Sequence, residues 1–290
     1  MISAVPLVAA IGSLGAMYVL GARMFSGTRW GIVSAVFFGL TPLLWREIQT
    51  APASLYPLSF VVGWLVAVAY WQGTLESEWA AIAGGVLGAG IYTSRAAVVM
   101  MPVYLLLTIA VVLYAGRVTV GHLAWLLGAF VVAAGPFTLS LLFHPDDFRE
   151  TVNAYHLYDT TRFTVWQGLR EMGSWVGLTA RSEVYFDFFN PAFLFTGRVL
   201  FWPLAVLVPA GLWRIVTHEP APLALLSLGG FFAAPCAAAL TAQAPNPRRI
   251  VFLTPFAAIV AVYGVQQVLS WPTWLFARQT RFNQVPRVEL

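Results

Sequence analysis

Two adjacent arginines stand at the start of an apolar run, in PNPRRIVFLTPF (245–256). Ionised side chains are costly near hydrocarbon, and only 10% of this chain is charged. The planar guanidinium of Arg248 or Arg249 offers a fork of donors that matches phosphate oxygens. The pair therefore predicts a site for a phosphorylated ligand at a membrane boundary. The alternative is that each arginine contacts lipid headgroups and anchors its own helix.

Two other boundary segments carry similar chemistry. WREIQ (45–49) places an arginine before a glutamate, and YTSR (92–95) ends in an arginine. Glu47 is the candidate catalytic base, and the alternative is a structural ion pair with a neighbouring arginine. The expected phosphate ligands are Arg46, Arg95, Arg248 and Arg249.

A long polar segment, residues 144–198, interleaves acids and arginines with aromatic side chains. We interpret it as a small folded segment, partly helical near 160–176, that lies on the outer membrane surface. Asp187, among aromatic residues in VYFDFFNP, fits a sugar site, whereas the alternative is a solvated acid in an interfacial aromatic belt. The expected sugar or acceptor contacts are Asp187, Asn190, His156 and Tyr92.

Metal and cofactor motifs are not evident. The sequence has no HExxH pattern, no dense acid cluster and a single cysteine, Cys236. No metal ligand and no cofactor are therefore predicted, although a divalent metal stays open. The glycine-rich stretch GGVLGAG (84–90) predicts close helix packing, because small residues let helix backbones approach each other.

The composition is that of a membrane protein. Of the 290 residues, 59% are hydrophobic, and the mean hydropathy is +0.77. Soluble domains carry roughly 25% charged residues. The net charge of +4 comes from arginine alone, and its scatter between apolar runs indicates membrane topology rather than nucleic-acid binding.

Charge-free runs define the expected elements: an all-α polytopic membrane protein with about nine transmembrane helices. Six are expected in residues 1–143 and three in residues 199–277, with the extracytoplasmic segment 144–198 between them and a cytoplasmic tail at 278–290. Three runs are short for a crossing. The nine runs are 1–22, 30–45, 48–75, 79–94, 96–116, 118–145, 199–213, 220–247 and 250–277.

Arginine bias sets the expected orientation. With the tail inside, the short inner segments and the tail hold seven arginines and the short outer loops hold four. The four boundary arginines then share the outer face with residues 144–198. The N-terminus would also lie outside, which is awkward for a chain without a leader, and one further upstream span would remove the difficulty.

Taken in order, four stretches resemble the C-fold membrane glycosyltransferases, in particular the bacterial relatives of protein O-mannosyltransferases and lipid A aminoarabinose transferases. The resemblance covers nearly the whole chain, and it depends on order and spacing because each motif alone is loose. The stretches are LGARMFSGTRWGIVSAVFFGLTPLLWREIQTAPASLYPL (20–58), GGVLGAGIYTSRAAVVMMPVYLLL (84–107), VYFDFFNPAFLFTGR (184–198) and PNPRRIVFLTPFAAIVAVYGV (245–265).

The resemblance implies an inverting sugar transfer on the extracytoplasmic face of the bacterial inner membrane. The donor would be a polyprenyl-phosphate sugar, the acceptor a protein, lipid or glycan, and Arg248 or Arg249 would hold the leaving phosphate. The family's first span and acid-bearing first outer loop have no counterpart after Met1, so Glu47 is the substitute acid. The alternatives are a transporter or flippase of a lipid-linked or anionic substrate, and a catalytically inactive membrane subunit of the same fold.

Overall fold

The computed structural model describes residues 4–50, 55–116, 118–143, 152, 164–196, 199–218, 221–241 and 243–282. Every regular element in these ranges is helical, which confirms the all-α prediction for this part of the chain. The first half contains α1 Ala4–Met24, α2 Thr28–Gly39, α3 Pro42–Thr50, α4 Tyr56–Thr74, α5 Ser77–Gly90, η2 Ile91–Thr93, α6 Arg95–Ala115 and α7 Val120–Phe143. The second half contains α9 Val165–Met172, α10 Trp175–Asp187, η3 Ala192–Thr196, α11 Leu204–Thr217, α12 Pro222–Ala233, α13 Cys236–Ala239, η4 Pro247–Ile250 and α14 Leu253–Phe282.

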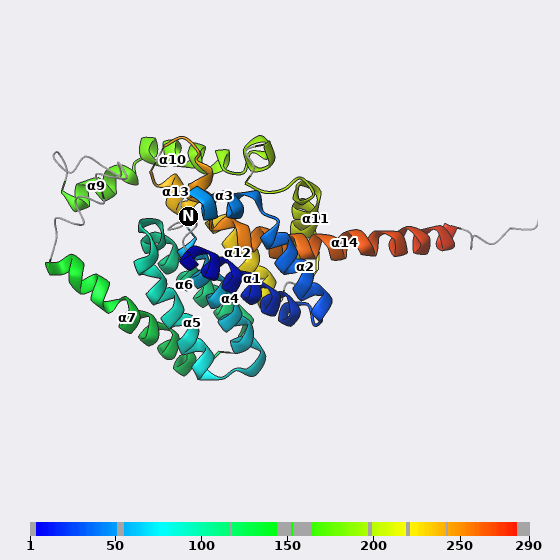
Figure 1. Cartoon of the computed structure of the whole chain (residues 1–290), viewed down its shortest axis with the longest axis horizontal. Coiled ribbons are helices and arrows are strands. Elements are labelled where there is room, and N and C mark those ends of the chain that lie inside the picture. Colours follow the sequence, from blue (N-terminus) through cyan, green and yellow to red (C-terminus); the bar gives the residue numbers. More distant parts are fainter. Residues whose placement is uncertain are drawn as a thin grey trace, which may run out of the picture.

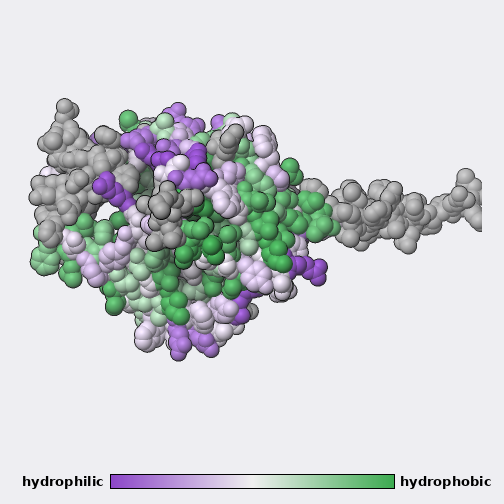
Figure 2. All heavy atoms as spheres, viewed as in Figure 1, coloured by the Kyte–Doolittle hydropathy of each residue, from purple (hydrophilic) through white to green (hydrophobic). Residues whose placement is uncertain are grey.

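Several helices have the length and composition of membrane spans. Counting α2 and α3 as one span bent by 53° adds a sixth to the five in the described ranges. Figure 2 shows a hydrophobic belt across the molecule, with hydrophilic residues gathered above and below it. The chain is therefore a helical membrane protein. The five spans are Pro6–Met24, Arg95–Ala115, Val120–Leu141, Pro222–Ala239 and Leu253–Ser270.

Each of the nine expected runs contains a helix, but nine crossings remain a prediction. The helices in the three short runs are α2, α5 and α11, with 12, 14 and 14 residues. At 1.5 Å per residue, such a helix reaches at most about 21 Å, which is short of the roughly 30 Å hydrocarbon core. The run 220–247 is also divided, because α12 and α13 are separated by a turn at Pro235.

Glycine brings α5 against α7. A Cβ atom added to Gly84 would lie 2.0 Å from the carbonyl oxygen of Leu126, and one added to Gly88 would lie 2.6 Å from that of Phe130. The packing prediction for GGVLGAG is confirmed. Gly211 and Gly264 bring α11 and α14 together in the same manner, with 1.9 Å and 2.0 Å to the facing carbonyl oxygens. Such close approaches increase the dispersion contacts that hold helices together in lipid.

The centre of the bundle lies between α4, α6 and the first half of α14. Trp64 and Tyr104 stack with ring centroids 5.1 Å apart, and Phe256 packs against both rings. The Trp64 indole N–H donates to Thr108 Oγ1 at 3.1 Å, which satisfies its polar atom. Figure 1 shows α14 leaving this centre and continuing past the rest of the bundle.

One end of the bundle gathers elements that are distant in sequence. α3 contacts η4, η4 contacts α13, and α13 contacts α10. Figure 1 shows α3, α10 and α13 together along the upper edge of the molecule. Of the region expected to be helical near 160–176, the described part forms α9 and the start of α10, which continues to Asp187.

Candidate anion-binding site

The site begins with a bend between α2 and α3. The chain turns by 53° between Gly39 and Pro42, and the Trp45 indole N–H donates to the Gly39 carbonyl at 2.6 Å across the bend. Proline fits the start of α3, because it has no N–H to leave unpaired there. The turn gives α3 a buried side, with Leu43, Leu44, Glu47 and Ile48, and leaves Trp45 exposed.

Glu47 lies beneath two arginines. Its Oε1 is 3.6 Å from Arg46 Nε and 3.5 Å from Arg248 Nε. The glutamate side chain has no exposed surface, whereas the arginine side chains are 39% and 51% exposed. A buried carboxylate needs charged partners to offset its lost hydration. Among the described residues, the one negative and two positive charges add up to +1, and the two arginine side chains are partly exposed.

Arg248 is oriented by its own loop as well as by Glu47. The Asn246 side chain accepts from the Arg248 backbone N–H at 3.0 Å and caps η4. The guanidinium Nη2 donates to Thr50 Oγ1 at 3.1 Å, and Thr50 is the last residue of α3. Two segments that are about 200 residues apart in sequence therefore hold one guanidinium in place (the hydrogen bond spans a separation of 198).

Arg249 is directed elsewhere. Its Nη1 donates to Thr241 Oγ1 at 2.7 Å, and its Nη2 donates to Gln243 Oε1. These bonds fold the side chain back onto the turn that precedes η4. The two adjacent arginines thus have different environments: Arg248 faces Glu47, and Arg249 closes its own loop.

Arg95, the fourth expected phosphate ligand, is not brought to Glu47. It is the exposed first residue of α6, and within the described part of the chain its guanidinium makes no ion pair or hydrogen bond. The preceding Ser94 caps the helix by accepting from the Ala97 N–H at 3.2 Å. The described cluster therefore contains two of the four arginines, Arg46 and Arg248.

Of the expected sugar or acceptor residues, Asp187 and Asn190 lie together at the end of α10, where the Asn190 N–H donates to the Asp187 carbonyl at 3.1 Å. Asp187 is exposed at the end of α10, and the side chain of Asn190 accepts from the Ala192 N–H at 2.9 Å. His156 lies outside the described residues.

Tyr92 has a structural contact that the sequence does not reveal. Its hydroxyl donates to the Ala133 carbonyl at 3.0 Å and accepts from the Phe137 N–H at 3.0 Å. In an unbroken helix these two backbone groups would bond to each other. Pro136 lies inside α7 beside these groups, and the tyrosine hydroxyl gives both of them a hydrogen-bond partner.

Arg181 was also missed by sequence reasoning. On α10, its Nε donates to the Leu240 carbonyl at 3.2 Å and its Nη1 to the Gly177 carbonyl at 2.9 Å. Burial lowers the pKa of this guanidinium. Leu240 directly precedes Thr241, the partner of Arg249, so two arginines hold the same turn from different elements.

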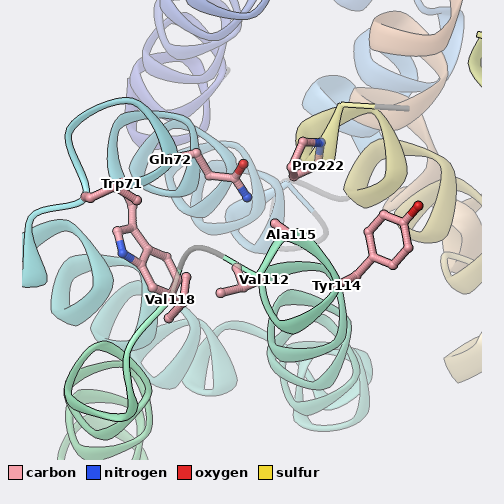
Figure 3. A pocket seen from close by; sticks show the side chains of 8 residues that line it. Trp71, Gln72, Val112, Tyr114, Ala115, Val118 and Pro222 are labelled. Carbon is pink, nitrogen blue, oxygen red and sulfur yellow. The ribbon is translucent and has the colours of Figure 1, made fainter. Parts of the chain in front are cut away.

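An apolar groove and a second cavity differ in how close they lie to the arginines. A groove of about 410 Å³ runs between α1 and α2, is lined by apolar side chains that include Tyr18, Ile32 and Val36, and reaches Trp45, the neighbour of Arg46. A second cavity, of about 530 Å³, lies at the C-terminal end of α4, and its lining includes Trp71, Gln72 and Tyr114 (Figure 3). Its described lining carries no charged side chain, so an anion fits the Arg46–Arg248 end better.

Among the residues that the structure describes, no three histidine, cysteine, aspartate or glutamate side chains gather as a metal site. Comparison of the chain with protein-family models, with curated proteins and with solved structures gives no match. The resemblance to C-fold glycosyltransferases therefore depends on the quoted stretches, and the function depends on the chemistry of the site.

Proposed function

We propose that this chain binds a polyprenyl-phosphate sugar and transfers the sugar to an acceptor on the extracytoplasmic side of the bacterial inner membrane. The observation that carries the proposal is the partly exposed pair Arg46 and Arg248, which a buried glutamate holds next to Trp45, a residue that lines an apolar groove. The groove suits an isoprenoid chain, and the guanidinium pair suits its phosphate. The proposal also includes nine transmembrane crossings, with the cluster of Arg46, Glu47 and Arg248 on the extracytoplasmic side.

The negative charge that develops during sugar transfer also favours a pair of arginines at the phosphate. When the sugar leaves its carrier, negative charge grows on the phosphate oxygens. Donors that already point at this position stabilise the transition state without further reorganisation. Arg46 and Arg248 are held by Glu47 before any ligand arrives, and Thr50 also holds Arg248.

In this proposal Glu47 positions the arginines and does not act as the base. Its carboxylate has no exposed surface on which to receive an acceptor hydroxyl. A Glu47→Gln variant separates the two roles. Loss of positioning weakens binding of polyprenyl phosphate as well as sugar transfer, whereas loss of a catalytic base lowers kcat and leaves that binding unchanged.

The burial of Glu47 also favours a second candidate, a non-catalytic subunit that binds a lipid phosphate. Both candidates predict donor binding, and only the first predicts sugar transfer. A flippase would instead move a labelled lipid-linked substrate from one leaflet of a vesicle membrane to the other, without release of free polyprenyl phosphate.

The test uses the whole protein in nanodiscs and measures binding of polyprenyl phosphate, with the uncharged polyprenol as the matched ligand. Wild-type protein is expected to prefer the phosphate, and the double variant Arg46→Ala/Arg248→Ala is expected to lose that preference. Arg29→Ala, which changes an exposed arginine at the start of α2, is the matched control. Equal affinity of the wild type for phosphate and alcohol would remove the basis of the proposal.

A further inference from the structure

α10 presents three different sides along its length. One side packs on the bundle through Arg181 and Tyr185. A second side is exposed and carries Trp175, Leu178 and Phe186, with the exposed polar residues Thr179 and Ser182 beside them. The three apolar residues have the spacing i, i+3 and i+11, which places them on one face of a helix.

The packed side fixes where α10 lies. Tyr185 donates its hydroxyl to the Phe232 carbonyl at 2.8 Å, and Arg181 donates to the Leu240 carbonyl at 3.2 Å. Phe232 belongs to the apolar segment Pro222–Ala239, which has the properties of a membrane span. Leu240 directly follows this segment. The two bonds therefore hold α10 beside the second half of a spanning segment and the residue that directly follows it.

The large apolar side chains on this side are highly exposed. Trp175 is 84% exposed, Leu178 is 52% exposed and Phe186 is 68% exposed. Beside this edge, Glu183 and Asp187 form an acidic edge that is also exposed. A helix with a protein side, an apolar edge and an acidic edge fits a position parallel to a membrane surface, with one edge in lipid and the other in water.

The size and composition of the edge favour lipid over a second protein. The three side chains expose on the order of 400 Å², whereas a stable protein interface buries about 800 Å² on each partner. Tryptophan is enriched where hydrocarbon meets headgroups, because its ring is amphipathic. α9 carries a further tryptophan, Trp166, that is 82% exposed.

We infer that the Trp175–Leu178–Phe186 edge of α10 is inserted into the leaflet on the side of α3 and η4. Glu183 and Asp187 remain in water. The binding partner is the bilayer, and insertion of α10 into it does not require that the protein transfers a sugar. In this position α10 anchors the extramembrane segment to the membrane beside the arginine cluster.

The experiment places single cysteines on α10 of the full chain. Cys236→Ala first removes the only native thiol. Leu178→Cys and Phe186→Cys report on the apolar edge, and Glu183→Cys on the same helix is the matched control. Leu106→Cys, at a 66% exposed position in the span Arg95–Ala115, marks hydrocarbon. Each cysteine is labelled with an environment-sensitive fluorophore in vesicles that contain lipids with a nitroxide near the headgroup.

Labels at 178 and 186 are expected to be quenched by these lipids at least about twofold more strongly than the label at 183. The label at 106 is expected to respond better to a nitroxide deep in the acyl chain. Equal quenching at 178 and 183 would overturn the inference, as would an unquenched label at 178 while the label at 106 is quenched. Disulfide-linked dimers through Leu178→Cys without lipid quenching would identify a second copy as the partner and also reject the inference.

Discussion

Replacing Arg248 and Arg249 one at a time should produce two different defects, although the residues are adjacent. Arg248 faces Glu47 and is half exposed, whereas Arg249 is bonded to Thr241 and Gln243 within its own turn. Arg248→Ala is therefore expected to impair ligand binding, and Arg249→Ala is expected to impair stability.

The magnitudes follow from these contacts. Arg248→Ala leaves the fully buried Glu47 carboxylate with one charged partner fewer, so some loss of stability is expected beside the loss of affinity. A charge-assisted hydrogen bond to phosphate contributes about 1.5–3 kcal/mol, so the affinity for polyprenyl phosphate should fall by about 10- to 150-fold. Arg249→Ala removes two hydrogen bonds of a charged donor and should cost about 1–3 kcal/mol of stability.

The assay pairs thermal unfolding with binding of polyprenyl phosphate for both variants in the same nanodiscs. Arg248→Lys keeps the charge but loses the planar fork, and it should fall between wild type and Arg248→Ala. The reasoning is refuted if Arg249→Ala loses more affinity than Arg248→Ala at a temperature where both variants are folded.

Three further outcomes can be measured by thermal unfolding. Tyr92→Phe removes the hydroxyl that bridges two backbone groups of α7 and should cost about 1–2 kcal/mol, with faster amide exchange at Phe137 and unchanged donor binding. Gly84→Ala should destabilise the protein by about 1–3 kcal/mol, because the new methyl group meets a backbone oxygen. Gly85→Ala is the control and should not destabilise it, because no atom lies within 4 Å of the new methyl group. Equal effects of the two substitutions would contradict the packing between α5 and α7. Tyr104→Phe removes a buried hydroxyl that has no hydrogen-bond partner in the described structure and should leave stability unchanged or raise it by about 1 kcal/mol, so a clear loss would indicate a partner for that hydroxyl.

Helix positions were largely predictable because charged residues are excluded from lipid-facing segments. Each charge-free run contains a helix, and the three short runs gave α2, α5 and α11. The packing of Gly84 and Gly88 was also predictable, since a stripe of small residues on an apolar helix has few other uses.

The arrangement of the site was not predictable in the same way. Glu47 next to Arg46 shows that an acid lies at a boundary, but its burial depends on the bend before α3, which sequence spacing does not define. Arg248 and Arg249 diverge because η4 is a 3₁₀ helix, in which consecutive residues are about 120° apart. The bond from Tyr92 to α7 links residues 41 and 45 positions apart and has no local signal except Pro136.

The turn at Leu240 and Thr241 is held from two directions, by Arg181 of α10 and by Arg249 next to η4. A displacement of α10 would be transmitted through this turn to Arg249, the neighbour of Arg248. With α10 inserted into the leaflet, a change in the thickness or lateral tension of the bilayer would change the distance between Arg46 and Arg248. The affinity for a phosphorylated carrier would then vary with the lipid composition of the membrane.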